Sequence, residues 1–317
     1  MCGISGIRAF RGQIKPEQIT ALLWGLHHRG TDASGIALAN SDTGIAVCKS
    51  PKPAWEFLAS EEYKNFITEN LRPTTWAVLA HVRQATQGTP SENGNNHPLF
   101  KDKSAVVHNG IIFNDDVIFR QEKLDRNAET DSDILRAILD KHGFTQKGIR
   151  ALSKVSGTVA AAALHQDFPG KLLLLRSGGP LTIAATEDQL LFASEKQALH
   201  RALRPWVTRF GIPVMDNKVD AGFATMALNS AWLFGAEGLE WHQEFTVTAM
   251  VDTRQAGYYQ KMVQKSSTNE TLLGVCPSKT CGLAKKGVEW TIQIGKKPKD
   301  FRCSECNSTL VAAGDRV

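Results

Sequence analysis

Short apolar runs predict β-strands along the first 245 residues. After a strand-like opening segment, these runs lie at 75–82, 104–112, 157–165, 171–176, 181–186 and 190–194. Residues 222–228 and 230–235 are interpreted as a final β-hairpin that turns around Asn229 and Ser230.

Apolar residues at helical spacing predict a helix over residues 15–30. Pro16 suits its first turn, and the apolar positions recur at Ile19, Leu22, Leu23 and Leu26. Another helix is predicted over residues 195–203.

Between these two lies a helix over 130–143, which we expect to be capped by Thr130 or Asp131 and to end near Gly143. Clusters of strands with intervening helices, without strict alternation of strand and helix, favour a layered α+β fold.

The composition is that of an ordinary globular protein, because 42% of the 317 residues are apolar and 22% are charged. The formal net charge of +5 does not by itself require a nucleic-acid partner. No run of about 20 apolar residues predicts a membrane span, and the N-terminus lacks the basic and apolar regions of a secretory signal. We therefore expect a cytoplasmic protein that does not act at a membrane.

Four of the six cysteines lie in the last 42 residues, as a C-x4-C pair and a C-x2-C pair separated by 21 residues. In a reducing compartment such clustering favours metal ligation over disulfides. The arrangement resembles a zinc ribbon, in which two turns each supply two thiolates to a tetrahedral Zn²⁺. We predict one structural zinc ion held by Cys276, Cys281, Cys303 and Cys306, and we expect Cys48 to be a small buried residue.

The composition becomes polar near Val251, which predicts a tether over 246–273 and a small zinc-ribbon-like module over 274–317. The module has eight Lys or Arg and four Asp or Glu, so it holds a net charge of +4. Its lysines, with Trp290 and Phe301, suit a nucleic-acid-binding face. A solvated basic surface explains the same charge equally well, and the sequence leaves both interpretations open.

The chain opens with "MCGISG", which places a cysteine directly after Met1. Removal of Met1 would leave one residue with both a thiol nucleophile and a free α-amine that can act as its base. The alternative is a chance cysteine, since many residues can follow Met1. The remaining motifs distinguish the two interpretations.

Five further fragments follow Cys2 in order: "HHRGTDASG" at 27–35, "HVRQATQG" at 81–88, "NNHPL" at 95–99, "HNGII" at 108–112 and "ETDSD" at 129–133. Each alone has a structural explanation, such as a hairpin turn at Asn109-Gly110 or a helix cap at Asp131. Together they resemble the class II glutamine amidotransferases, and most closely the glutaminase domain of glucosamine 6-phosphate synthase. "RSGGPL" at 176–181 and "FASEKQAL" at 192–199 extend the resemblance.

The resemblance implies a four-layer αββα N-terminal-nucleophile hydrolase domain over residues 1–245. It implies that Cys2 attacks the γ-amide carbon of L-glutamine and releases ammonia, without a cofactor for this step. Asn109 and Gly110 match the oxyanion hole of the family, whose donors stabilise the tetrahedral intermediate.

The same resemblance implies four substrate-binding residues, Arg83, Thr86, His97 and Asp131. Arg83 matches the residue that binds the α-carboxylate of glutamine, for which a planar guanidinium is suited. Asp131 matches the acid that holds the α-ammonium, while Thr86 and His97 help shape the pocket. Arg29 and Gly30 match a supporting motif beside the nucleophile.

Two positions depart from the family pattern. Relatives commonly have Trp after the carboxylate-binding Arg and His after the Thr, where this chain has Gln84 and Gln87. The resemblance implies that these positions belong to a loop that covers bound glutamine, so we expect the departures to bear on loop closure and to leave the hydrolytic chemistry intact.

We therefore expect a glutamine amidotransferase subunit whose ammonia passes to an acceptor handled by a partner enzyme or docked at the C-terminal module. About 70 residues follow the predicted glutaminase domain, too few for a sugar-isomerase, phosphoribosyltransferase or ATP-pyrophosphatase domain. The alternative is a scaffold protein that keeps a glutaminase fold and uses its zinc ribbon to recognise nucleic acid or protein. The complete set of predicted catalytic and substrate-binding residues favours the enzyme.

Overall fold

The computed structural model describes residues 1–203, 206–207, 213–214, 222–247, 272–275, 289–292 and 311–312. The chain divides into two units, Met1–Ala249 and Met250–Val317. The second unit contains an antiparallel sheet of three short strands, β16 (Leu272–Val275) between β17 (Glu289–Ile292) and β18 (Val311–Ala312). The four cysteines predicted to bind zinc, and most of the predicted tether, lie outside the described residues.

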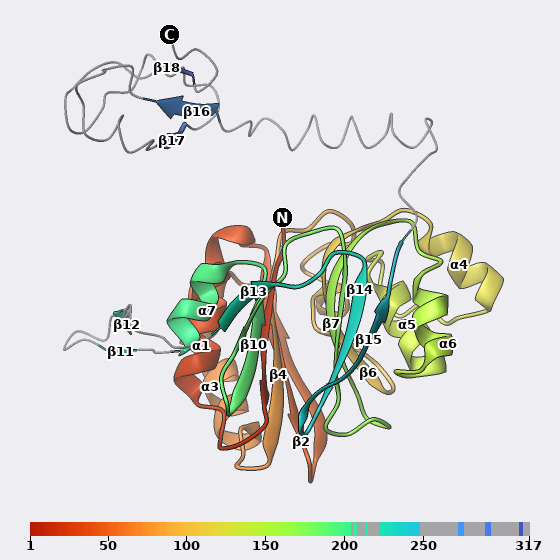
Figure 1. Ribbon diagram of the computed structural model, residues 1–317, viewed down its shortest axis with the longest axis horizontal. Coiled ribbons are helices and arrows are strands. Elements are labelled where there is room, and N and C mark those ends of the chain that lie inside the picture. The colour runs from red at the N-terminus through yellow and green to blue at the C-terminus, as the bar shows by residue number, and fades with distance from the viewer. Residues whose placement is uncertain are drawn as a thin grey trace. The chain divides into compact units, whose positions relative to one another are not determined.

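The first unit is built on two antiparallel sheets (Figure 1). One sheet has seven strands in the order β13-β9-β10-β1-β4-β2-β3. These strands are β1 (Gly3–Ala9), β2 (Ala33–Asn40), β3 (Gly44–Ser50), β4 (Thr75–Arg83), β9 (Thr182–Ala185), β10 (Gln189–Ala193) and β13 (Gly222–Thr225).

The other sheet has six strands in the order β15-β14-β8-β7-β6-β5. These strands are β5 (Leu99–Phe100), β6 (Ser104–Ile112), β7 (Gly157–His165), β8 (Leu172–Ser177), β14 (Ser230–Gly235) and β15 (Gly238–Glu244). Two short strands, β11 (Trp206–Val207) and β12 (Pro213–Val214), pair separately from both sheets.

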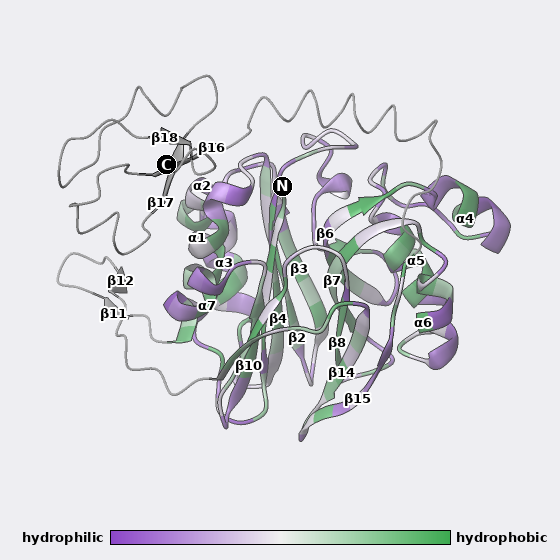
Figure 2. Cartoon of the chain, turned by 45° about the horizontal axis from the view of Figure 1, so that its top comes forward, coloured by the Kyte–Doolittle hydropathy of each residue, from purple (hydrophilic) through white to green (hydrophobic). Residues whose placement is uncertain are grey.

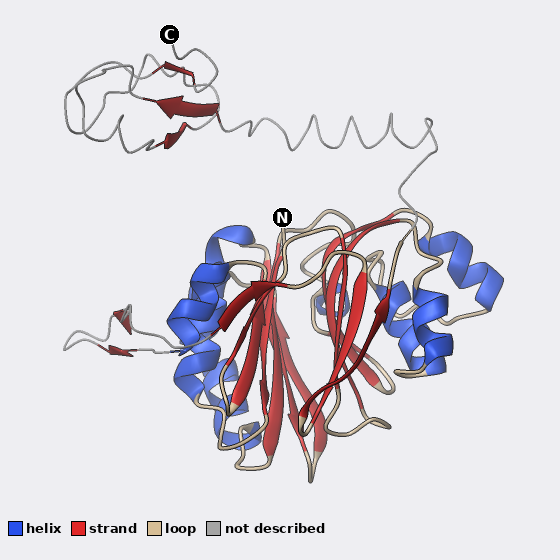
Figure 3. Cartoon of the chain, viewed as in Figure 1, coloured by secondary structure: helices blue, strands red, loops and turns tan. Residues whose placement is uncertain are grey.

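Helices cover the outer face of each sheet (Figures 1 and 3). The seven-stranded sheet is covered by α1 (Pro16–Leu26), α2 (Ala54–Ala59), α3 (Glu61–Asn70) and α7 (Lys196–Leu203). The six-stranded sheet is covered by α4 (Asp115–Glu122), α5 (Asp133–His142) and α6 (Gln146–Leu152). The layers of this unit therefore run helix, sheet, sheet, helix, and the predicted α+β class is confirmed.

Three apolar clusters fill the spaces between these four layers. Because successive strand residues point to opposite faces, Ile36 of β2 packs toward the helices and Ala37 packs between the sheets. Alanine recurs in the cluster between the sheets, at Ala37, Ala39, Ala77, Ala105, Ala160 and Ala162. Strands buried on both faces are predominantly hydrophobic, as Figure 2 shows for β4, β8 and β10.

The predicted hairpin around Asn229 and Ser230 is wrong. β13 pairs with β9 in the seven-stranded sheet, whereas β14 pairs with β8 and β15 in the six-stranded sheet. Residues 226–229 thus connect the two sheets, and Asn229 takes a left-handed conformation with φ of 55° at the end of this connection. Each strand finds its partner in a different layer, which sequence spacing alone does not indicate.

The helix predicted from residue 130 begins later, at Asp133, although it ends at Gly143 as expected. Thr130 and Asp131 do not cap it, because the Asp131 carboxylate accepts a hydrogen bond from the backbone N–H of Ile112 in β6 instead. The Asp131 carboxylate is therefore held at the end of β6, in the neighbouring layer, and does not cap α5.

Candidate active site

Cys2 lies directly before β1, the central strand of the seven-stranded sheet. β1 is antiparallel to β4, so the beginning of β1 lies beside the end of β4, where Gly3 pairs with Val82. The Cys2 sulfur consequently lies 3.4 Å from the backbone nitrogen of Gln84 and 3.4 Å from its carbonyl oxygen. The residue is half-buried, in contact with the loop that follows β4.

Burial raises the pKa of the Cys2 thiol. The Gln84 N–H, the positive chain terminus and Arg83 lower this pKa, whereas the negative charge of Asp131 raises it. The charges of Arg83 and Asp131 therefore both act at the sulfur. Because its pKa is raised, the thiol is protonated at neutral pH and needs a base to become a nucleophile.

Arg29 and Gly30 hold the backbone around Cys2. Arg29 donates from Nε to the Cys2 carbonyl oxygen at 2.8 Å and from Nη1 to Glu195 at 2.8 Å. A Cβ atom on Gly30 would lie 2.3 Å from the carbonyl carbon of Arg83, so only glycine permits this approach. The pair thus ties the chain terminus to the end of β4.

Arg83 is the last residue of β4, and its side chain is almost fully buried. Its Nη1 donates to the side-chain oxygen of Asn96 at 2.7 Å, and its Nη2 donates to the carbonyl oxygens of Gln87 and Gly88, the latter at 2.9 Å. The loop after β4 therefore folds back onto the guanidinium group. Thr86, in the same loop, is exposed.

Asp131 is also buried, between α5 and the end of β6. One carboxylate oxygen accepts from the Ile112 N–H at 2.6 Å, and the other accepts from the hydroxyls of Thr130 and Ser132 at 3.2 and 3.1 Å. The backbone N–H of Asp131 donates to the side-chain oxygen of Gln87 at 3.1 Å. Gln87 therefore contacts both Arg83 and Asp131.

Asn109 and Gly110 lie in β6, paired with Ala160 and Val159 of β7. Within the described part of the chain, the side-chain amide of Asn109 forms no hydrogen bond. A Cβ atom on Gly110 would lie 2.0 Å from the carbonyl oxygen of Thr158, so the strand requires glycine here.

A histidine pair joins the two sheets near these residues. His81 of β4 lies with Nε2 3.1 Å from the carbonyl oxygen of His108 in β6, and its ring stacks on His97 at 4.2 Å between centroids. Burial lowers the pKa of His81 to about 3 and that of His97 well below its ordinary value, so both rings are neutral. The structure places His97 inside this junction, buried and stacked on His81.

Several residues that sequence reasoning missed also connect the site. Asp32 accepts hydrogen bonds from the Ala85 N–H at 2.7 Å and from the side chain of Gln84 at 3.0 Å. Asn96 binds Arg83, and Glu195 binds Arg29. Asp32, Asn96 and Glu195 all stand in quoted fragments, at 27–35, 95–99 and 192–199, but the sequence did not indicate which side chains they contact.

Among the described residues, no group of three or more His, Cys, Asp or Glu side chains is arranged to hold a metal ion. In the same part of the chain, no helix is long and apolar enough to cross a membrane. The described residues offer a thiol before β1, a buried cation at the end of β4, a buried carboxylate hydrogen-bonded to the end of β6, and within β6 an amide that has no hydrogen-bond partner among them.

Residues 81–201 match the family model of the glutamine amidotransferase domain. The chain is 31% identical over 216 residues to glutamine–fructose-6-phosphate aminotransferase (isomerizing) of Fusobacterium nucleatum, covering 64% of this chain and 33% of that protein. It is 34% identical over 215 residues to the protein of the same name from Agrobacterium fabrum, covering 63% of this chain and 32% of that protein. The chain thus spans about a third of the length of these relatives.

A solved structure with a similar fold is that of glutamine phosphoribosylpyrophosphate amidotransferase from B. subtilis. It superposes with a TM-score of 0.59 at 20% identity and covers 77% of this chain and 49% of that chain. At this identity the similarity shows a shared fold.

Proposed function

We propose that this chain, an enzyme that carries a glutamine amidotransferase domain, hydrolyses L-glutamine to L-glutamate and ammonia through a thioester on Cys2. The observation that most supports this proposal is the convergence of chemically complementary groups from two sheets. The Cys2 sulfur lies against Gln84 at the end of β4, and both Arg83 and Asp131 act on its charge.

The thiol needs a base, because burial raises its pKa. Removal of Met1 gives Cys2 its own α-amine, whose ordinary pKa of about 8 suits a proton acceptor near neutral pH. The amine accepts the thiol proton, directly or through a water molecule. The base then belongs to the same residue as the nucleophile.

The thiolate of Cys2 adds to the γ-amide carbon of glutamine, forming a C–S bond and a tetrahedral oxyanion. The C–N bond breaks as the protonated amine returns its proton to the leaving nitrogen, and ammonia departs. Water then adds to the thioester carbonyl, the C–S bond breaks, and glutamate leaves with the thiol restored. Asn109 and the backbone N–H of Gly110 are proposed to donate to the oxyanion in both steps.

Arg83 and Asp131 are proposed to recognise the two charged groups of the substrate. The guanidinium of Arg83 pairs with the α-carboxylate, and the carboxylate of Asp131 pairs with the α-ammonium. Both side chains are buried, which strengthens charge-assisted hydrogen bonds to a ligand. The carbonyl oxygens of Gln87 and Gly88 accept hydrogen bonds from Nη2 of Arg83. The α-carboxylate of glutamine must therefore displace them wherever it binds this nitrogen.

We expect Met1 to be absent from active protein. Its retention would place the free amine one residue away from the thiol and add a side chain at the site. The chain should be produced behind a cleavable extension that leaves either Cys2 or Met1-Cys2 as the new terminus. Glutaminase activity should appear only for the Cys2 terminus, and intact-mass measurement identifies each product; equal activity of the Met1-Cys2 form would contradict the mechanism.

The fate of ammonia is a separate proposal. The relatives from Fusobacterium and Agrobacterium are named as aminotransferases that act on fructose 6-phosphate, and this chain matches about a third of their length. We propose that a partner enzyme, or an acceptor docked at the second unit, receives the ammonia. The net charge of +4 over residues 274–317 would suit an anionic acceptor such as a nucleic acid.

We also propose one structural Zn²⁺ per chain, bound by Cys276, Cys281, Cys303 and Cys306. In sequence, the first pair follows β16 and the second lies between β17 and β18, so each falls in a connection between described strands. Metal analysis of the purified full chain should give one zinc per chain. Cys276→Ser or Cys303→Ser should lose it, Cys48→Ser should keep it, and a metal-free wild type would refute the assignment.

A further inference from the structure

Two adjacent buried asparagines lie between the proposed carboxylate-binding and ammonium-binding residues. Asn95 ends a 3₁₀ turn, Asn93–Asn95, and Asn96 follows it. Their exposed fractions are 3% and 0%, so neither amide has access to bulk water. A buried amide that loses a partner is costly, and the contacts of both amides therefore fix their orientation.

Asn96 holds Arg83. Its side-chain oxygen accepts from Nη1 of Arg83 at 2.7 Å, and its side-chain nitrogen donates to the carbonyl oxygen of Pro90 at 2.8 Å and to Asn93 at 3.1 Å. The donor side of this amide is fully used. Its oxygen must therefore face the guanidinium group.

Asn95 holds the segment that carries Asp131. Its side-chain nitrogen donates to the Glu129 carboxylate at 2.9 Å, and its side-chain oxygen accepts from the Glu129 backbone N–H at 2.8 Å. The same nitrogen lies 3.3 Å from the carbonyl oxygen of Thr89, in the loop over Arg83. This reciprocal pair fixes the backbone two residues before Asp131.

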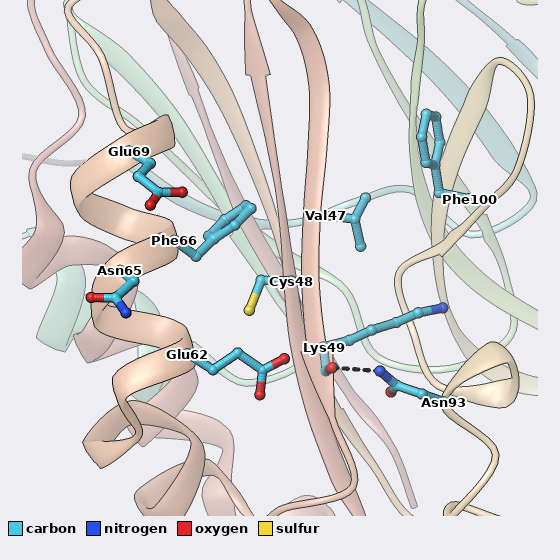
Figure 4. A pocket seen from close by; sticks show the side chains of 9 residues that line it. All are labelled: Val47, Cys48, Lys49, Glu62, Asn65, Phe66, Glu69, Asn93 and Phe100. Atoms are coloured by element: carbon cyan, nitrogen blue, oxygen red, sulfur yellow. Dashed lines mark hydrogen bonds between the residues drawn. The ribbon is translucent and has the colours of Figure 1, made fainter.

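The 3₁₀ turn Asn93–Asn95 is anchored to β3 by hydrogen bonds with Lys49 (Figure 4). Asn93 donates to the carbonyl oxygen of Lys49 at 2.7 Å, and the ammonium of Lys49 donates to the carbonyl oxygens of Asn96 and Pro98 at 2.7 and 3.2 Å. These contacts border a pocket of about 520 Å³ between β3 and α3. The pair Asn95–Asn96 is therefore attached to the sheet and cannot move freely with either loop.

We propose that Asn95 and Asn96 are positioning residues that set the separation between Arg83 and Asp131. Together they select ligands that have both a carboxylate and an ammonium on the same carbon. This inference rests on the proposed glutaminase function. Each asparagine has a distinct part: Asn96 positions the carboxylate site, and Asn95 positions the ammonium site.

Three competitive inhibitors of glutamine hydrolysis separate these parts: L-glutamate, glutarate without the ammonium, and 4-aminobutyrate without the α-carboxylate. Asn96→Ala should raise the inhibition constants of glutamate and glutarate about 10-fold and leave that of 4-aminobutyrate within about 2-fold. Asn95→Ala should raise those of glutamate and 4-aminobutyrate and spare that of glutarate. Asn65→Ala, an exposed change on α3, is the matched control and should shift none.

Milder variants keep the test valid if an alanine variant does not fold. Asn96→Asp retains the acceptor for Arg83, loses the two hydrogen bonds that the amide nitrogen donates to Pro90 and Asn93, and adds a charge that competes with the ligand carboxylate, so it should follow the Asn96→Ala pattern. Glu129→Ala removes half of the Asn95 contact and should follow the Asn95→Ala pattern, whereas Glu129→Gln retains an acceptor and should shift the constants less.

The outcomes distinguish this inference from the proposed function. A wild-type protein with a processed terminus that neither hydrolyses glutamine nor binds glutamate would overturn the proposed function. An active wild type whose variants weaken all three inhibitors equally would overturn the positioning roles alone, because a general loss of structure does not discriminate between ligand charges. The positioning roles are supported if Asn96→Ala weakens glutamate and glutarate alone and Asn95→Ala weakens glutamate and 4-aminobutyrate alone.

Discussion

Replacement of Cys2 by alanine should abolish glutamine hydrolysis, with a loss of at least about 10³-fold in kcat. No other described thiol can substitute for it, because Cys48 is a buried residue of β3 and burial raises its pKa to about 12. Cys2→Ser should be nearly as inactive, since a hydroxyl is a much weaker nucleophile for this base. Release of glutamate from glutamine, measured on protein whose terminus has been verified by mass, provides the test.

A glutamine-analogue electrophile should label Cys2 and leave Cys48 unmodified under native conditions. Cys48→Ser is the matched control and should retain activity and labelling. Saturating label on Cys48, or substantial glutaminase activity in the Cys2→Ala protein, would show that the nucleophile has been assigned to the wrong residue.

Replacement of Asn109 by alanine should lower kcat by roughly 10²–10³-fold and change KM little. The reason is that its amide forms no hydrogen bond within the described residues, so its donor is free for charge that develops only during the reaction. Steady-state kinetics with glutamine separates the two constants. Asn65→Ala, which removes an exposed amide elsewhere, should have wild-type kinetics.

A different kinetic result for Asn109→Ala would change the role proposed for its side-chain amide. If Asn109→Ala raised KM and spared kcat, the side chain would bind the ground state of glutamine rather than the oxyanion. Unchanged kinetics would remove Asn109 from the site, and the backbone of Gly110 would then be the remaining donor proposed here.

The sequence was most informative where a strand is buried on both faces. β4, β6, β7, β8 and β10 were all predicted from apolar runs, and α1 from its helical spacing. The helices α2, α3, α4 and α6 were not predicted. α2 and α6 have six and seven residues, too few for a clear apolar period, and α3 and α4 are rich in charged and polar residues. The edge strand β3 was missed because its residues are largely half-buried and mixed in polarity, and β2 was missed although it is buried along its length, since Ser34, Gly35 and Asn40 interrupt its apolar run.

The error at Asn229 has a different cause. The segment 222–235 has the spacing of a hairpin, but hairpin spacing does not determine which sheet each strand joins. That choice depends on β8 and β9, which lie about 50 residues earlier and offer free edges in separate layers.

The resemblance to glutamine amidotransferases drawn from the motifs is confirmed over residues 81–201, which match the glutamine amidotransferase domain model. The motifs selected candidate residues whose types the proposed reaction requires. Asn95, Asn96 and Glu195 also stand in these motifs, but the sequence did not indicate their contacts, because their partners Glu129, Arg83 and Arg29 lie in other segments of the chain. The departures Gln84 and Gln87 acquire a meaning only in the structure, where Gln84 contacts Asp32 and Gln87 contacts Asp131.

The central place of β1 in its sheet has a consequence for synthesis of the chain. β1 precedes both of its sheet neighbours, β4 and β10, in the chain, and Ser5 pairs with Ala193. At about 5–20 residues per second, roughly 10–40 seconds pass before β10 has been made. Until then β1 lacks one of its two neighbours, so we expect an aminopeptidase that removes Met1 to act before the sheet closes around Cys2.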